Sequence, residues 1–525
     1  MMCFALLMIL LVSFPYCINC ANILVLETVP SPSHHIWIRT ITTALAAAGH
    51  NVTSLSPDIE EETPENLHYL HLDKVYDVIY NPEDEDFIMS PNFLTWGALN
   101  SYLQMVIIHM SPEFILKGCL KSTGFHQLLA YPDDFKFDLV IYDLFVMGIM
   151  LPFVQKFNNP PLITLSIVPS IQIISQIFGG SLQSAYVPHL LNENTDLSTF
   201  RARINNFLIA HLDYFWLEYF IVPRLNKLLK KGFHRDVDIK ELNRLSKVAL
   251  MNNHPGLDKI EQAFPNVISV GGLQIQRNRT LNKDLQEVMD NAKSGAILFS
   301  LGTNVKSEML GDARQIEILE AFRALPQYTF IWKFEADSLP VEVPSNVVIK
   351  KFVPQNDLLA HPNMKLFISH CGLLSTQESV WYGVPILGLP VFGDNWLIMK
   401  LSIKTGVAEQ GDLRNIERNA FKKLIEKMIN DPKYNENAKI RSKIFRDQKE
   451  TPLERAIWWI EYVLRHPNMT HMRSQSMDYN IAQRQSWDVL AFLYTVFLVT
   501  VLILVKMCCC VCRSCVKEKL KIKKD

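Results

Sequence analysis

Short apolar runs alternate with helical stretches along most of this chain, and this alternation constrains its fold more than any other feature. Residues 21–27 (ANILVLE) and 137–143 (FDLVIYD) are apolar at successive positions and stop at an acidic residue. Strands that lack polar alternation are typical of parallel sheets that helices cover on both faces. The sequence therefore predicts an α/β protein whose strands are joined by crossover helices.

The alternation occurs in two series, which predicts two domains. The first series begins at residue 21, and the second begins at Gly295, after a polar stretch at 274–284 (QIQRNRTLNKD). Single hydrophobic cores stop growing at about 250–300 residues, so a chain of 525 residues is expected to divide. We predict two doubly wound domains, at 21–272 and 273–450.

Apolar segments at both ends predict membrane targeting. Residues 3–14 form an apolar run, so residues 1–20 are predicted to be a secretory signal peptide, with an uncleaved anchor as the alternative. Residues 489–505 carry no charge and are long enough to cross the hydrocarbon core as a helix. The remaining predicted segments are helices leading to the membrane at 451–486, a transmembrane helix at 487–506 and a tail at 507–525.

Charged residues orient the predicted span. Lys506 and Arg513 follow the apolar run, so the C-terminal end should be cytosolic and the body lumenal, in a single-pass type I arrangement. Lys521 and Lys523 are spaced as in the dilysine retrieval signals of endoplasmic-reticulum membrane proteins. The alternative is a basic patch on anionic lipid. The sequence thus predicts a protein of the endoplasmic-reticulum membrane.

Cysteine usage excludes one class of protein, and the net charge gives no support to another. Only Cys119 and Cys371 lie between the predicted signal peptide and the predicted span, so a fold stapled by disulfides is excluded. A net charge of −1 favours no nucleic-acid partner. The cysteines at 508–515 could carry acyl chains or have no role. Glycosylation sequons occur at Asn51, Asn278 and Asn468.

Residues 352–395 carry the pattern of a nucleotide-sugar site. Phe352 could stack on a base whose edge Gln355 reads, Glu378 could hold ribose hydroxyls, and Asp394 with Asn395 could hold a hexose. Turn amides, hydroxyls and a histidine at two strand ends could bind the diphosphate. The predicted donor-site residues are Ser300, Gly302, Thr303, Phe352, Gln355, His370, Gly372, Ser375, Glu378, Asp394 and Asn395.

With these motifs the chain resembles the membrane-bound animal UDP-glycosyltransferases, which include glucuronosyltransferases and arthropod glucosyltransferases. The resemblance covers nearly the whole chain. It implies two facing Rossmann-like domains (the GT-B fold), with the acceptor bound by the first and the UDP-sugar by the second. It also implies inversion at the sugar carbon and no metal or other cofactor. The motifs, in chain order, are SPSHHIW, AGH, FDLVIYD, VGGL, FSLGT, the segment 352–395 and the lysine-rich tail.

The resemblance also implies a catalytic pair. His34, expected in the loop after the first strand, would take the proton of the acceptor hydroxyl, because imidazole titrates near neutral pH. Asp143 would orient His34 and stabilise the imidazolium. The competing residues are His35, which should point elsewhere, and Asp138, at the wrong end of its strand.

The expected reaction is transfer of a hexose, first glucose and second glucuronic acid, to small lipophilic acceptors, and a homo- or hetero-oligomer is possible. Two departures from the family pattern, at Cys371 and Asn395, leave open a catalytically silent, membrane-tethered binding protein or partner subunit. Cys371 replaces a glycine and would be strained at positive φ, Phe352 replaces a tryptophan, and Asn395 replaces a glutamine. Lys333 or Arg277 could replace an arginine of vertebrate members.

Metal-dependent transfer is the chemical alternative, because Asp236-Val237-Asp238 has the spacing of a divalent-cation motif. The aspartates precede a helical pattern and no apolar strand leads to them, so the sequence favours a helix cap.

Overall fold

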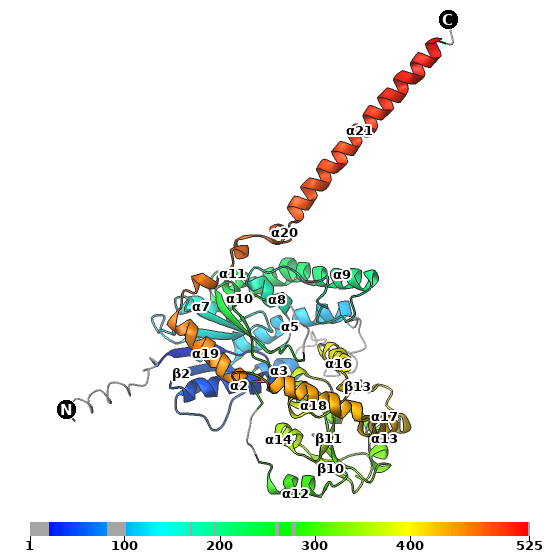
Figure 1. Ribbon diagram of the computed structural model, residues 1–525. Helices are drawn as coiled ribbons and strands as arrows, with labels where there is room; N and C mark the ends of the chain where they lie inside the picture. Colours follow the sequence, from blue (N-terminus) through cyan, green and yellow to red (C-terminus); the bar gives the residue numbers. More distant parts are fainter. Residues whose placement is uncertain are drawn as a thin grey trace, which may run out of the picture.

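The structure is a computed structural model that describes residues 20–80, 101–168, 171–192, 195–257, 262–275 and 280–522. The predicted signal peptide and Asn278 lie outside these residues. Figure 1 shows a body of two lobes, from which one long helix extends.

The first half of the chain builds a sheet in which all paired strands are parallel. Its strand order among the described residues is β3-β2-β1-β4-β5-β6-β7. Strands β2 and β3 are added on one side of β1 and strands β4 to β7 on the other, so the strand order reverses between β1 and β4. The strands are β1 (Asn22–Leu26), β2 (Asn51–Ser56), β3 (Leu67–His71), β4 (Leu139–Asp143), β5 (Leu162–Ser166), β6 (Ser246–Met251) and β7 (Val267–Ser269). The helices are α2 (Pro32–Ala47), α3 (Val75–Tyr80), α5 (Ser101–Lys121), α6 (Thr123–Leu129), α7 (Pro152–Lys156), α8 (Ile171–Ile177), α9 (Phe200–Trp216), the π-helix η1 (Leu217–Ile221), α10 (Val222–Phe233) and α11 (Ile239–Asn243).

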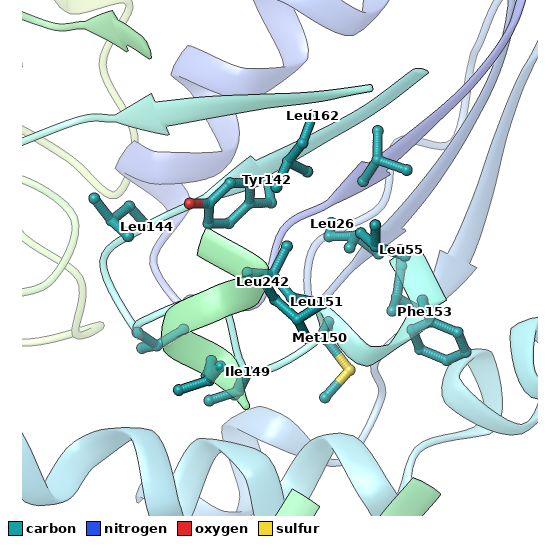
Figure 2. Close-up of a cluster of buried hydrophobic side chains, with 14 of the residues drawn as sticks. Leu26, Leu55, Tyr142, Leu144, Ile149, Met150, Leu151, Phe153, Leu162 and Leu242 are labelled. Carbon is teal, nitrogen blue, oxygen red and sulfur yellow. The ribbon is translucent and has the colours of Figure 1, made fainter. Parts of the chain in front are cut away.

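Helices cover both faces of this sheet, which explains its apolar strands. Leu24 and Leu26 of β1 belong to a core cluster that includes residues of α5, α7, α10 and α11, part of which Figure 2 shows. Ile23 and Val25 pack in a second cluster, with α2. Because both sides of β1 are buried, hydrophobic side chains are favoured at each of these positions.

The second half repeats the plan with an all-parallel sheet of order β10-β9-β8-β11-β12-β13. The order reverses between β8 and β11. The strands are β8 (Ala296–Ser300), β9 (Thr329–Lys333), β10 (Val347–Lys350), β11 (Met364–Ser369), β12 (Ile386–Gly388) and β13 (Ala408–Gln410). The helices are α12 (Lys283–Asn291), η2 (Ser307–Leu310), α13 (Asp312–Arg323), α14 (Gln355–Ala360), α15 (Leu373–Tyr382), α16 (Asn395–Lys404), α17 (Arg418–Asn430) and α18 (Pro432–Arg446). Two doubly wound domains were predicted, and the structure confirms them.

After α18 the chain returns to the first domain through α19 (Pro452–Arg465). Ala456, Ile460 and Val463 of α19 are fully buried in the cluster that contains Ile23 and Val25. The helix thus covers the first sheet, although it follows the second domain in the sequence. Short turns, η3 (Thr470–Met472), η4 (Gln475–Asp478) and α20 (Ile481–Arg484), then lead to the last helix.

The last helix, α21 (Trp487–Ile522), projects away from the body (Figure 1). Its stretch Trp487–Arg513 is long and apolar enough to cross a membrane, and its most apolar part packs against nothing else in the described chain. The predicted membrane-spanning stretch at 487–506 lies within this helix, which continues to Ile522. No glycine or proline interrupts residues 487–522, so nothing local stops it.

Candidate active site

Both sheets end on one cleft between the lobes. In open α/β sheets, ligands bind beyond the carboxyl ends of the strands, where the strand order reverses. His34 follows β1 and Asp143 ends β4 at the first reversal, while Ser300 ends β8 and His370 follows β11 at the second. The cleft has a volume of about 340 Å³ and is lined from both lobes.

His34 and Asp143 form a buried pair at the first-domain side of the cleft. His34 Nδ1 lies 2.9 Å from Asp143 Oδ2. Asp143 is 1% exposed, and its Oδ1 accepts a hydrogen bond from the Phe145 amide at 3.0 Å. A carboxylate only accepts, so Nδ1 carries the proton and Nε2 is left with a lone pair. Since His34 lines the cleft and Nδ1 is engaged, Nε2 is the atom available to a substrate.

The location of His34 differs from the prediction. It was expected in a loop but lies in the first turn of α2, which begins at Pro32. Proline is well suited to a first helical position, because its missing N–H would have no partner there. The PSHH segment therefore extends the helix toward the cleft and fixes the histidine on a regular element.

The two rival residues have other partners. His35 Nδ1 lies 3.1 Å from Glu27 Oε2, and its Nε2 lies 3.2 Å from Glu60 Oε1. Asp138 precedes β4 and accepts the Asn22 amide at 2.8 Å, at the opposite end of the sheet from Asp143. The structure thus brings His34 and Asp143 together and leaves His35 and Asp138 out of the cleft.

Two glycines make space for His370 at the second-domain side. A Cβ on Gly302 would lie 2.5 Å from the His370 ring, and a Cβ on Gly372 would also lie 2.5 Å from it. Burial, with a smaller effect of the Lys333 charge, lowers the pKa of His370 to about 4, so the ring is neutral near pH 7. Its Nδ1 has no hydrogen-bond partner among the described residues. A neutral imidazole held in this way can donate one hydrogen bond to a phosphate oxygen.

Lys333 places a cation beside this ring, although the sequence predicted it only as a possible substitute for an arginine. The residue ends β9 and lines the cleft. Its ammonium donates to the Gly302 carbonyl at 2.9 Å and to Glu335 Oε1 at 2.7 Å. Arg277, the other candidate, lies outside the described residues. Lys333 is thus placed in the cleft where it can meet negative charge.

Cys371 has the positive φ at which a cysteine was expected to be strained. Its φ is 66°, and its sulfur lies 3.3 Å from Met399 Sδ. A Cβ on Gly388 would lie 2.4 Å from that sulfur, so the absence of a side chain at 388 makes room for the thiol. The turn accepts cysteine through this local packing, and the neighbouring Gly372 keeps an ordinary φ of −62°.

The predicted base and ribose contacts lie at one end of the cleft. The Phe352 side chain is open to solvent, with 75% of the residue exposed, and can offer a ring face to a base. Gln355 donates to Glu378 Oε2 at 2.6 Å and to Ser375 Oγ at 3.0 Å. Burial raises the pKa of Glu378 to about 7, although hydrogen bonds from Gln355, Asn356 and Gln274 oppose the rise. Gln355 and Glu378 therefore bind each other where each was predicted to bind the nucleoside.

The predicted sugar contacts line the same cleft as His34. Asp394 precedes α16 and Asn395 begins it, and both line the cleft. Burial raises the pKa of Asp394 to about 6, and a backbone hydrogen bond and the charge of His34 oppose the rise. Ser300 and Thr303 also line the cleft, and Ser300 Oγ accepts the Gly302 amide at 3.3 Å.

Comparison with known proteins agrees with this architecture. The sequence pattern of the family described as "UDP-glucoronosyl and UDP-glucosyl transferase" matches residues 21–522. This chain belongs to that family. It is 30% identical over 490 residues to the UDP-glycosyltransferase UGT5 of Dactylopius coccus, covering 92% of this chain and 90% of the relative. It is 29% identical to the human UDP-glucuronosyltransferase 2B7, covering 96% of each chain.

Solved structures show the same fold. The glycotransferase of kitacinnamycin matches with a TM-score of 0.58 at 16% identity, covering 85% of this chain and all of that one. UGT2 of Phytolacca americana, in complex with UDP-2-fluoroglucose and pterostilbene, matches with a TM-score of 0.56 at 14% identity. The match covers 84% of this chain and 99% of that one. The chain is thus a UDP-sugar glycosyltransferase of the glucosyl- or glucuronosyl-transferring family, with two facing Rossmann-like domains.

The UDP-glycosyltransferase has a second cavity beside His34. It has a volume of about 200 Å³, and its lining is mostly apolar. Phe145 and Val168 line both this cavity and the cleft. The Phe145 ring meets the His34 imidazole edge-on at 5.2 Å, so the cavity begins beside the His34–Asp143 pair.

A buried charged group lies at the wall of this cavity. Asp213 Oδ1 lies 2.5 Å from His109 Nε2, and its other oxygen lies 3.4 Å from His189 Nε2. These hydrogen bonds outweigh the effect of burial and hold the pKa of Asp213 below its ordinary value. No short motif marked these residues, since they come together only through folding.

Two other predicted features can be located. Asp238 caps α11 by accepting the amides of Lys240 and Glu241, which confirms the predicted helix cap. Asn468 is exposed, whereas Asn51 begins β2 and donates to Asn22 Oδ1 at 3.0 Å. Glu27, His35 and Asp58 bring possible ligand atoms within 4.8 Å of one another, but His35 already binds Glu27 and none of the three lines the cleft.

Proposed function

We propose that this chain transfers a hexose from a UDP-sugar to a hydroxyl of a small lipophilic acceptor, with inversion and without a metal ion. The observation that carries the proposal is the His34–Asp143 pair, which faces the predicted UDP-sugar residues across one cleft. The Phytolacca neighbour, bound to a UDP-sugar analogue and pterostilbene, supports the assignment of donor and acceptor classes.

In this mechanism His34 Nε2 takes the proton of the acceptor hydroxyl while the oxygen attacks the anomeric carbon. The bond from that carbon to the β-phosphate oxygen breaks on the opposite face, and UDP leaves with the electron pair. Asp143 stabilises the imidazolium that forms. His370, Lys333 and the turn amides stabilise the negative charge on the leaving diphosphate.

The charges of the cleft favour glucose as the transferred sugar. Two cationic side chains line the cleft within the described part of the chain, and both are paired: Arg39 with Glu60 and Lys333 with Glu335. Asp394 adds a carboxyl beside the predicted sugar position. A glucuronate carboxylate would face Asp394, and neither cation would be free to pair with it, because Arg39 binds Glu60 and Lys333 is assigned to the diphosphate. Glucuronosyl transfer is the second candidate, because the human relative carries that name.

Acceptor-dependent release of UDP tests the proposal. The full-length protein in lipid vesicles would be incubated with a phenol and a panel of UDP-sugars, with and without EDTA. We expect UDP-glucose to be the best donor and EDTA to have no effect. A preference for UDP-glucuronate would favour the second candidate, and loss of transfer in EDTA would contradict a metal-free mechanism.

Two variants test the catalytic pair in the same assay. His34→Ala and Asp143→Asn should each lower kcat by about 10²–10⁴-fold, because the base or its orientation is lost. The affinity for the UDP-sugar should stay near that of the unmodified protein. Transfer that both variants leave unchanged would contradict the assignment and favour a binding protein.

We also propose that α21 spans the endoplasmic-reticulum membrane and that both lobes are lumenal. The apolar stretch Trp487–Arg513, the basic tail and the exposed sequon at Asn468 support this topology. Endoglycosidase H treatment of the protein expressed in animal cells should lower its apparent mass, and Asn468→Gln should remove part of that shift. A body that protease digests in intact microsomes would contradict the orientation.

A further inference from the structure

The outward side of α9 and η1 is apolar and exposed. We call this side the outer apolar face and define it as Phe200, Ile204, Leu208, Leu212, Phe215 and Tyr219. These residues recur every three or four positions, so they lie on one side of the helix. Phe200 is 73% and Tyr219 63% exposed. Helices on the surface of soluble domains present polar residues outward, so this face requires a partner.

The inner side of the same segment is already occupied by the fold. Ala202, Ile209 and Ala210 are buried. The two acidic residues in the sequence of this segment also turn inward, since Asp213 binds His109 and Glu218 binds Lys240. No carboxylate therefore interrupts the outer apolar face. Helix surfaces that face water usually carry such charged side chains.

The outer apolar face lies where the last helix leaves the body. Figure 1 shows α9 along the side from which α21 extends. The ring of Trp487, the first residue of α21, lies 5.6 Å from the ring of His211 on α9. Arg484, three residues earlier, donates to the Gly180 carbonyl at 3.1 Å, next to α8. The start of the proposed membrane span is thus attached to the helix that bears the outer apolar face.

We propose that the outer apolar face is a membrane-docking surface, seated in the leaflet through which α21 enters the bilayer. The proposal rests on α21 spanning a membrane, as proposed above, and not on the catalytic assignment. The span brings this side of the body against the bilayer, so lipid is the partner nearest to the exposed side chains. Amphipathic helices bind at such interfaces through the apolar area they bury, and tryptophan is enriched there.

The docking would place the second cavity, which we take to receive the acceptor, next to lipid. Ala210, Tyr214 and Leu217 of the same segment line the second cavity, and so does Arg484. A helix with its side chains is about 10–12 Å across, so one helix would separate the cavity from the acyl chains. A lipophilic acceptor dissolved in the membrane would then reach His34 without first crossing bulk water.

Photolabelling of the full-length protein in phosphatidylcholine vesicles tests the docking. The vesicles would contain a phosphatidylcholine with a diazirine on its acyl chain, and labelled peptides would be mapped by mass spectrometry. We expect label on α21 and on residues 200–220, and none on α18. Label on α21 with none on 200–220 would overturn the docking surface while leaving the span intact.

Matched variants sharpen the test. Ile204→Gln/Leu208→Gln/Leu212→Gln should lower labelling of 200–220 at least fivefold and leave that of α21 unchanged. The control is Ile440→Gln/Ile444→Gln, which alters two exposed isoleucines of α18 and should change nothing. Binding of the UDP-sugar to both variants would show that they fold. Cross-links between two protein copies through 200–220 that replace the lipid label would overturn the proposal in favour of a protein interface.

Discussion

His370 and the glycines beside it show how single residues shape the donor site. The ring occupies the space that side chains at 302 and 372 would need, and its low pKa keeps it neutral. Glycine is thus required at both positions because a side chain would clash with the ring, and at 302 also because of the backbone conformation. Gly302 has a φ of 85°, whereas Gly372 has a φ of −62° that any residue can adopt.

Gly372→Ala therefore tests the packing of the ring alone. We expect about a tenfold loss of UDP-sugar affinity, equal to about 1.4 kcal/mol, because the new Cβ displaces the imidazole. Isothermal titration calorimetry measures this directly. Gly311→Ala is the control, because a Cβ at Gly311 would have no described atom within 4 Å, and it should leave the affinity unchanged although its φ is 75°. Equal affinities of the Gly372→Ala and unmodified proteins would contradict the account.

The raised pKa of Glu378 predicts a pH dependence of donor binding. A carboxylate accepts hydrogen bonds from two ribose hydroxyls, so binding should favour the ionised form. Below the pKa of about 7 the proton must first leave, and affinity for the UDP-sugar should fall up to tenfold per pH unit. UDP-sugar titrations between pH 5.5 and 8.5 measure this, and Glu378→Gln should flatten the profile. If UDP-sugar affinity depends on pH in the same way in Glu378→Gln as in the unmodified protein, another group is responsible for the pH dependence.

At the scale of elements, α19 joins the second domain back to the first. Thr451 begins it with a reciprocal capping box to Glu454, and its buried face completes the core behind β1 and α2. Its partner sheet lies more than 180 residues earlier in the sequence. Helical periodicity can therefore predict the helix but cannot identify the sheet that it covers.

Thr451→Ala should destabilise the protein by about 0.5–2 kcal/mol, because the cap hydroxyl is lost and the Glu454 amide is left without its hydrogen-bond acceptor. Chemical denaturation followed by circular dichroism measures the free energy of unfolding. Thr451→Ser keeps the hydroxyl and should retain most of the stability. If the free energy of unfolding falls as much in the serine variant as in the alanine variant, the capping box does not stabilise α19.

At the scale of the whole molecule, the sequence predicted the two doubly wound domains and the residues at their strand ends. Those predictions succeeded because a parallel sheet requires continuous apolar strands, and because its strand ends collect polar side chains. The helical position of His34 was missed, although Pro32 is a local signal for the start of a helix. The Gln355–Glu378 contact and the Asp213 group were not predicted, since each depends on how separate elements pack together.

The lobes are also held together by contacts that no local pattern predicts. Gln377 on α15 donates to Asn252 Oδ1 in the first domain at 2.9 Å. Ser31 and Asn304 hydrogen-bond across the cleft mouth, with their side-chain atoms 3.0–3.1 Å apart. These contacts keep the His34 side of the cleft opposite the donor side, which the proposed reaction requires.

A crystal structure with a non-transferable UDP-2-fluoro sugar and an acceptor tests the central claim most directly. The account predicts that the acceptor hydroxyl lies about 2.6–3.2 Å from His34 Nε2 and faces the anomeric carbon, with the diphosphate beside His370. An acceptor oxygen that contacts another base, or a sugar bound away from Asp394, would contradict it.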